Sequence, residues 1–118
     1  KSGIKRIINA FGYSKDGLAA AYRYESAFRQ VLWLNLILIV LTFILNFDSA
    51  TKMLLIIASF VSLITELFNT AVEAAVDHTS TEKHELAKRA KDAGSAAQLL
   101  ALTMLGIVWA IALWRGYV

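Results

Sequence analysis

A segment that follows the apolar run Met53–Ile64 carries three carboxylates and one amide: Glu66, Asn69, Glu73 and Asp77. At about 100° per residue in an α-helix, these four side chains fall within roughly 60° of arc. They therefore form a polar stripe along one helix. Acidic groups in an apolar span are costly, so they usually face a bundle interior or a water-filled site and mark function. We expect the rest of the chain to position this polar stripe.

The chemistry open to the polar stripe changes along its length. Glu66 has the most apolar surroundings, and a buried carboxylate is a useful proton acceptor near neutral pH, so it is the candidate general base. Glu73 and Asp77 lie nearer the end of the span and offer the oxygen ligands that Mg²⁺ prefers. Glu25 is expected at the same membrane level as a further ligand, and Lys91 as a cation that offsets phosphate charge. Phosphoryl transfer is thus permitted, although no Walker-type or kinase glycine-rich loop is present.

Other functions fit parts of the same pattern. The polar stripe could hold helices together in a structural assembly protein, or line the path of a small ion or proton transporter. A transporter would need ionisable groups across the whole span, and Met53–Ile64 has none. Glu25 and Arg29, at i,i+4 spacing, are by default an ordinary helix ion pair. His78 and His84 are not at i,i+4 spacing and no cysteine accompanies them, so a zinc site is not expected.

Composition indicates one integral-membrane domain. The chain has 118 residues, of which 58% are hydrophobic, against about 45–50% in a typical soluble domain. It has no cysteine and no proline, and its first residues do not resemble a signal peptide. The net charge of +3 suits anionic headgroups or an anionic substrate, and the absence of a basic patch interleaved with aromatic residues excludes nucleic acid as a partner.

Hydrophobic periodicity predicts an all-α membrane protein with an N-terminal amphipathic surface helix at about 3–28 and spans at about 29–47, 52–76 and 94–114. Gly12 and Gly17 bracket a predicted turn, after which a second amphipathic piece covers about 18–30. Asp48 or Ser49 is the expected N-cap of the second span.

The last span also has recognisable ends. A capping box, Thr79-x-x-Glu82, predicts that its helix starts near Ser80. The small residues from Gly94 onward permit close helix packing, and Trp109 and Trp114 are expected in an interfacial belt at the far end.

Basic residues predict the orientation. Only Lys52 and Arg115 are on one side of the predicted spans. The other ten are on the opposite side: Lys1, Lys5, Arg6, Lys15, Arg23, Arg29, Lys83, Lys88, Arg89 and Lys91. The positive-inside rule places the N-terminus and the 77–93 segment in the cytoplasm and the C-terminus outside.

The segment Glu66–Asp77, ELFNTAVEAAVD, resembles the E-x-x-N-[ST]-A-[IV]-E-x-x-V-D signature of the small bacterial integral-membrane diacylglycerol kinases. The resemblance continues through Arg6–Ile8, Gly12–Ser14, Glu25–Gln30 and 84–97, and so covers essentially the whole chain. It implies an inner-membrane homotrimer that transfers the γ-phosphoryl group of ATP to diacylglycerol, giving phosphatidic acid, with an active site shared between neighbouring subunits. The related undecaprenol kinases share the motif and remain the nearest alternative.

The resemblance also implies roles for matching residues. Glu66 would be the general base, Asn69 would position the base or the metal site, and Asp77 would support it. Glu25 and Glu73 would hold Mg²⁺ with ATP. Further nucleotide contacts would be Arg6, Tyr13, Glu82, Lys83, His84, Lys91 and Asp92. The lipid substrate would meet Glu66 and also Arg6, Ser14, Lys15, Arg29, Ser95, Trp109 and Trp114.

Three positions depart from the family pattern. Val31 stands where an acidic residue is usual, His78 where a basic residue is usual, and Phe68 where an aliphatic residue is common. None coincides with the proposed base or metal ligands.

Overall fold

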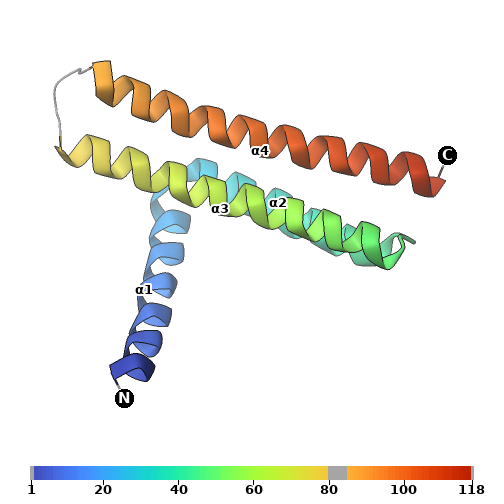
Figure 1. Ribbon diagram of the computed structural model, residues 1–118, viewed down its shortest axis with the longest axis horizontal. Helices are drawn as coiled ribbons and strands as arrows, with labels where there is room; N and C mark the ends of the chain where they lie inside the picture. The colour runs from blue at the N-terminus through green and yellow to red at the C-terminus, as the bar shows by residue number, and fades with distance from the viewer. Residues whose placement is uncertain (1, 80–84, 118) are drawn as a thin grey trace.

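The computed structural model describes residues 2–79 and 85–117, which form four α-helices and no strand (Figure 1). They are α1 (Ser2–Tyr24), α2 (Ser26–Ile44), α3 (Ser49–Thr79) and α4 (Glu85–Tyr117). The last three are long and apolar enough to cross a membrane. The predicted all-α membrane architecture is therefore confirmed. The predicted capping box and the helix start near Ser80 involve residues outside the described ranges.

Helix α1 projects away from the other three helices, which run side by side (Figure 1). Its apolar residues Ile4, Ile7, Ile8 and Phe11 recur at helical spacing and are all at least 60% exposed. An amphipathic helix whose apolar stripe has no partner in its own chain is suited to lie on a membrane surface.

The predicted turn between Gly12 and Gly17 is wrong, because α1 runs through both glycines without interruption. A glycine inside a helix costs about 1 kcal/mol relative to alanine, but it does not break the helix as proline does. Leu18 and Ala21, which follow Phe11 at helical spacing, line a groove between α1 and α3, and Ala21 is buried. The two glycines therefore weaken α1 without ending it.

The second amphipathic piece expected over 18–30 is also wrong, because the chain bends at Glu25. Glu25 has an extended backbone (φ −118°, ψ 106°) and separates α1 from α2. One guanidinium nitrogen of Arg29, Nη1, donates to the carbonyls of Tyr22 (2.6 Å) and Arg23 (3.2 Å). These are carbonyls that the end of α1 leaves without helical partners, so Arg29 stabilises the bend. The default ion pair between Arg29 and Glu25 is replaced by this arrangement.

Helix α3 is central and packs against both α2 and α4. Its start is capped as expected: Asp48 Oδ1 accepts the backbone N–H of Thr51 (3.2 Å), and the Asp48 carbonyl accepts that of Lys52 (3.0 Å). Hydrogen bonds from Thr51 hold the pKa of the Asp48 carboxyl below its usual value. Arg115 in α4 lies 3.9 Å from the same carboxylate, which links the two helices at this end.

The apolar core lies at the capped end of α3. Trp109 meets Phe47 edge to face at 5.8 Å, and both pack with Leu55, Ala58, Leu105 and Ala112. Trp109 is only 9% exposed, so its expected place in an interfacial belt is wrong; Trp114, at 68% exposed, remains available for one. The indole of Trp109 is held inside because α4 directs it at Phe47 in the α2–α3 connection.

Candidate active site

Glu66 lies where α3 packs against α4, and its side chain is buried with only 5% of its surface exposed. The side-chain amide of Gln98 in α4 donates a hydrogen bond to Glu66 Oε1 (2.9 Å). The same Gln98 nitrogen donates to the backbone carbonyl of Ser62, one turn earlier in α3 (3.2 Å). A buried carboxylate is therefore held in one orientation by an amide from the neighbouring helix.

A second buried amide supports the other side of α3. Asn35 in α2 is fully buried, and its Nδ2 donates to Ser62 Oγ (2.7 Å) and to the Val31 carbonyl (2.9 Å). The Ser62 hydroxyl in turn donates to the Ser59 carbonyl (3.0 Å). Hydrogen bonds thus connect α2, α3 and α4 in a single layer next to Glu66. Val31 belongs to this layer through its backbone.

Exposure increases along the polar stripe from Glu66 to Asp77. Asn69 is half-buried, although its Oδ1 is fully enclosed, and Glu73 is half-buried. Asp77 is exposed and pairs with Lys91 of α4 across 3.0 Å. Because α3 is continuous from Ser49 to Thr79, the four side chains share one helix as predicted.

The carboxylates of Glu25, Glu66 and Glu73 influence one another electrostatically. Glu73 and Glu25 are close enough to Glu66 for their negative charges to repel it. Within residues 2–79 and 85–117, however, no three histidine or acidic side chains form a group that could hold a metal ion alone. Mg²⁺ is commonly held by one or two carboxylates completed by substrate phosphates and water. The oxygen donors of Glu25 and Glu73 fit that pattern.

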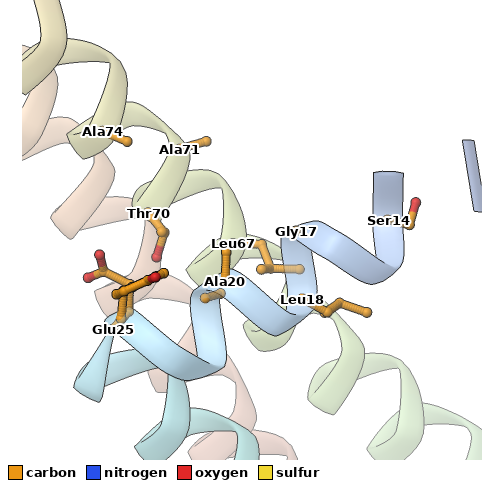
Figure 2. Close-up of a pocket in the computed structure, with 11 residues that line it drawn as sticks. Ser14, Gly17, Leu18, Ala20, Glu25, Leu67, Thr70, Ala71 and Ala74 are labelled. Carbon is orange, nitrogen blue, oxygen red and sulfur yellow. The ribbon is translucent and has the colours of Figure 1, made fainter. Parts of the chain in front are cut away.

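A groove of about 530 Å³ runs between α1 and α3 and ends at Glu25 (Figure 2). Figure 2 shows Glu25 and Thr70 at one end of this groove and Ser14 and Leu18 at the other. Most other lining residues are small or apolar: Gly17, Ala20, Ala21, Tyr24, Leu67, Ala71 and Ala74. Such walls suit an apolar chain, and the polar end contains Glu25, one of the two proposed metal ligands.

Several predicted site residues lie elsewhere or have other partners in this chain. Asp92 pairs with Lys88 at i,i+4 (2.7 Å), and Arg29 supports the bend at Glu25. Arg6, Tyr13 and Lys15 are exposed on α1, and Ser95 is exposed on α4. Trp109 lies about 16 Å along α4 from Gln98, and Trp114 lies further still. Glu82, Lys83 and His84 are outside the described ranges.

Sequence reasoning missed Gln98, Ser62 and Asn35. A signal was present: Ser59 and Ser62 extend the polar stripe of Glu66 deeper into the apolar run, at offsets of seven and four residues. Gln98 and Asn35 are the amides that the facing spans place at that depth. Such polar residues inside apolar spans usually bond across helices.

Gly94 gives Asn69 its place beside α4. A β-carbon at position 94 would overlap Asn69 Oδ1, so the close approach of these helices requires glycine, as the run of small residues predicted. A β-carbon at Gly106 in the same helix would meet nothing within 4 Å. These two glycines form a matched pair.

We expect Gly94→Ala to displace the Asn69 side chain and to lower both stability and turnover. Overpacking of this kind costs about 1–3 kcal/mol of unfolding free energy. Gly106→Ala should be neutral or stabilising, because alanine is the better helix former. Thermal unfolding in detergent and lipid phosphorylation rates check this expectation, and equal behaviour of the two variants would contradict it.

Comparison with known proteins identifies the family. The family model described as prokaryotic diacylglycerol kinase matches residues 12–113. Diacylglycerol kinases of Pseudomonas aeruginosa, Helicobacter pylori and Escherichia coli are 49%, 50% and 46% identical to this chain. The alignments cover 93%, 91% and 98% of this chain and 89%, 84% and 95% of those relatives. With three described helices of membrane-spanning length and a buried carboxylate at the first position of the family signature, the chain belongs to the prokaryotic diacylglycerol kinase family.

Proposed function

We propose that this bacterial membrane protein transfers the γ-phosphoryl group of ATP to the free hydroxyl of diacylglycerol, with Glu66 as the general base. The observation that carries the proposal is the buried Glu66 carboxylate, held by Gln98 through one oxygen. The other oxygen, Oε2, accepts no hydrogen bond from the described residues and is left for a substrate hydroxyl.

The reaction balances with this arrangement. Glu66 accepts the hydroxyl proton, the hydroxyl oxygen bonds to the γ-phosphorus, and the bond from that phosphorus to the bridging oxygen breaks, releasing ADP. Such transfers depend on positioning and charge stabilisation more than on covalent chemistry. A general base placed within hydrogen-bond reach of its proton contributes about 10²–10⁴-fold to the rate.

Glu25 and Glu73 would hold Mg²⁺ with ATP at the wetter end of the polar stripe. The cation would neutralise charge on the transferred group. Asn69 would position the base or the metal-bound phosphates, and the Lys91–Asp77 pair would present a lysine to the nucleotide. The proposed nucleotide contacts Arg6, Tyr13, Glu82, Lys83, His84 and Asp92 would complete this half of the site.

The groove between α1 and α3 offers a path for the lipid, because its apolar walls lead to Glu25. Ser14 lines it, and Lys15, Arg29 and Ser95 would serve the headgroup. Arg6, Trp109 and Trp114 lie too far along their helices to reach Glu66 of the same chain. A homotrimer whose subunits share active sites would allow Arg6, on the projecting α1, to serve the site of a neighbouring subunit, whereas Trp109 and Trp114 would remain at the other end of the spans. The excess of basic residues over 1–29 and 83–91 supports a cytoplasmic location for the site.

A labelled-ATP assay in mixed micelles that offers diacylglycerol and undecaprenol tests the substrate. Labelled phosphatidic acid as the main product is expected. Preferential labelling of undecaprenol would show that the protein is a lipid kinase whose substrate is undecaprenol instead of diacylglycerol. Absence of any labelled lipid from a folded preparation would contradict the proposal altogether.

A further inference from the structure

The Gln98 side-chain amide uses both of its N–H groups on α3. They donate to Glu66 Oε1 and to the Ser62 carbonyl, at 2.9 and 3.2 Å. All of this is shielded from solvent: Gln98 is 7% exposed, Glu66 5% and Ser62 0%. An amide nitrogen has two protons to donate, so the two contacts exhaust its capacity.

We infer that Gln98 is a positioning residue for catalysis, which keeps the Glu66 carboxylate ionised and leaves its second oxygen, Oε2, to take the proton of the lipid hydroxyl. This inference rests on the proposed role of Glu66 as the general base. Gln98 itself touches neither substrate nor metal in this assignment. It acts through Glu66 alone.

The orientation of the amide follows from its two acceptors. A backbone carbonyl and a carboxylate oxygen both accept hydrogen bonds, so the nitrogen and not the oxygen of Gln98 must face them. The Ser62 carbonyl belongs to α3 and cannot rotate away. The amide therefore presents a donor to Glu66 at all times, and a donor favours the ionised form of a carboxylate.

The hydrogen bond from Gln98 acts against other effects that disfavour the ionised form of Glu66. The other charged groups that act on Glu66, Glu73 in α3 and Glu25 at the α1–α2 bend, are both negative and so disfavour its ionised form. The contact from α4 is the neutral Gln98. Without that contact, Glu66 would hold its proton over a wider range of pH and would not act as a base there.

A purely structural role for Gln98 makes a different prediction. An amide that only joined α3 to α4 would affect stability when removed, but the pH dependence of catalysis would be unchanged. The shape of the pH–rate profile therefore separates the two roles.

The test replaces Gln98 with methionine, which has a similar length and no donor. For Gln98→Met we expect kcat at neutral pH to fall about tenfold, as for loss of a hydrogen bond to a charged group. The acidic limb of the kcat profile should move about one unit to higher pH, so that activity recovers at alkaline pH. The KM for ATP and the Mg²⁺ requirement should change little, because Glu73 and Glu25 remain.

Thr42→Val is the matched control. Thr42 is 1% exposed and its hydroxyl donates to the Leu38 carbonyl in α2 (2.8 Å), so this variant removes a partly buried hydrogen bond that does not involve Glu66. Its pH profile should match that of the unmodified protein. If Gln98→Met does not fold, Gln98→Asn keeps a polar amide but withdraws it from Glu66, and a smaller shift in the same direction is expected.

A folded Gln98 variant with an unshifted acidic limb would overturn the inference. Glu66→Gln, measured in parallel, tests the general base separately. If Glu66→Gln is inactive while the Gln98 profile is unshifted, only the positioning role fails. If Glu66→Gln remains active, the proposed base itself is wrong.

Discussion

Replacing Glu66 with glutamine is expected to lower kcat for diacylglycerol phosphorylation by about 10²–10⁴-fold, the contribution of a general base. The amide cannot accept the hydroxyl proton at neutral pH. The fold should survive, because the substituted side chain has the same shape and its carbonyl oxygen can still accept the hydrogen bond from Gln98. Initial rates of phosphatidic acid formation, measured with elution volume and thermal unfolding in detergent, check both parts.

Asp48→Asn is a suitable control for this experiment. It also neutralises a carboxylate, but at the opposite end of α3, and asparagine remains a good N-cap for the contact with Thr51. Its turnover should be that of the unmodified protein. A Glu66→Gln variant that retained near-normal turnover would refute the general-base role.

Replacing Glu73 with glutamine is expected to raise the Mg²⁺ concentration needed for half-maximal activity by about tenfold or more, since one of two charged ligands is lost. Glu73 is half-buried and acts electrostatically on Glu66, so its charge contributes to the field inside the candidate active site and is not fully screened by solvent. Titrating Mg²⁺ at fixed ATP, with kcat and the apparent KM for ATP determined at each concentration, measures the effect.

The two substitutions should differ in how they are rescued. Excess Mg²⁺ should restore much of the activity of Glu73→Gln, because the metal site is weakened while the base is intact. It should not restore Glu66→Gln. An unchanged Mg²⁺ dependence in Glu73→Gln would remove Glu73 from the proposed metal site, whatever the fate of kcat.

Local patterns predicted the parts of this protein that depend on neighbouring residues. The apolar runs predicted three long helices, and the polar turn predicted the cap at Asp48. The same local reasoning failed at Gly12–Gly17, where two glycines lower the helix propensity of α1 but do not break it as proline would. It also failed at Trp109, because the position of a tryptophan near a span end does not distinguish an interfacial anchor from a core residue, and Trp109 packs in the core against Phe47.

Residue types and their spacing alone determined that this chain is an all-α membrane protein with a polar stripe at Glu66, Asn69, Glu73 and Asp77, because helical periodicity is set along the chain. Only the tertiary structure decided what holds that stripe. Gln98 comes from α4, 32 residues away from Glu66, and Asn35 from α2 lies 27 residues from Ser62. Such pairings depend on how α2, α3 and α4 are rotated and displaced against one another, which periodicity within each helix does not specify.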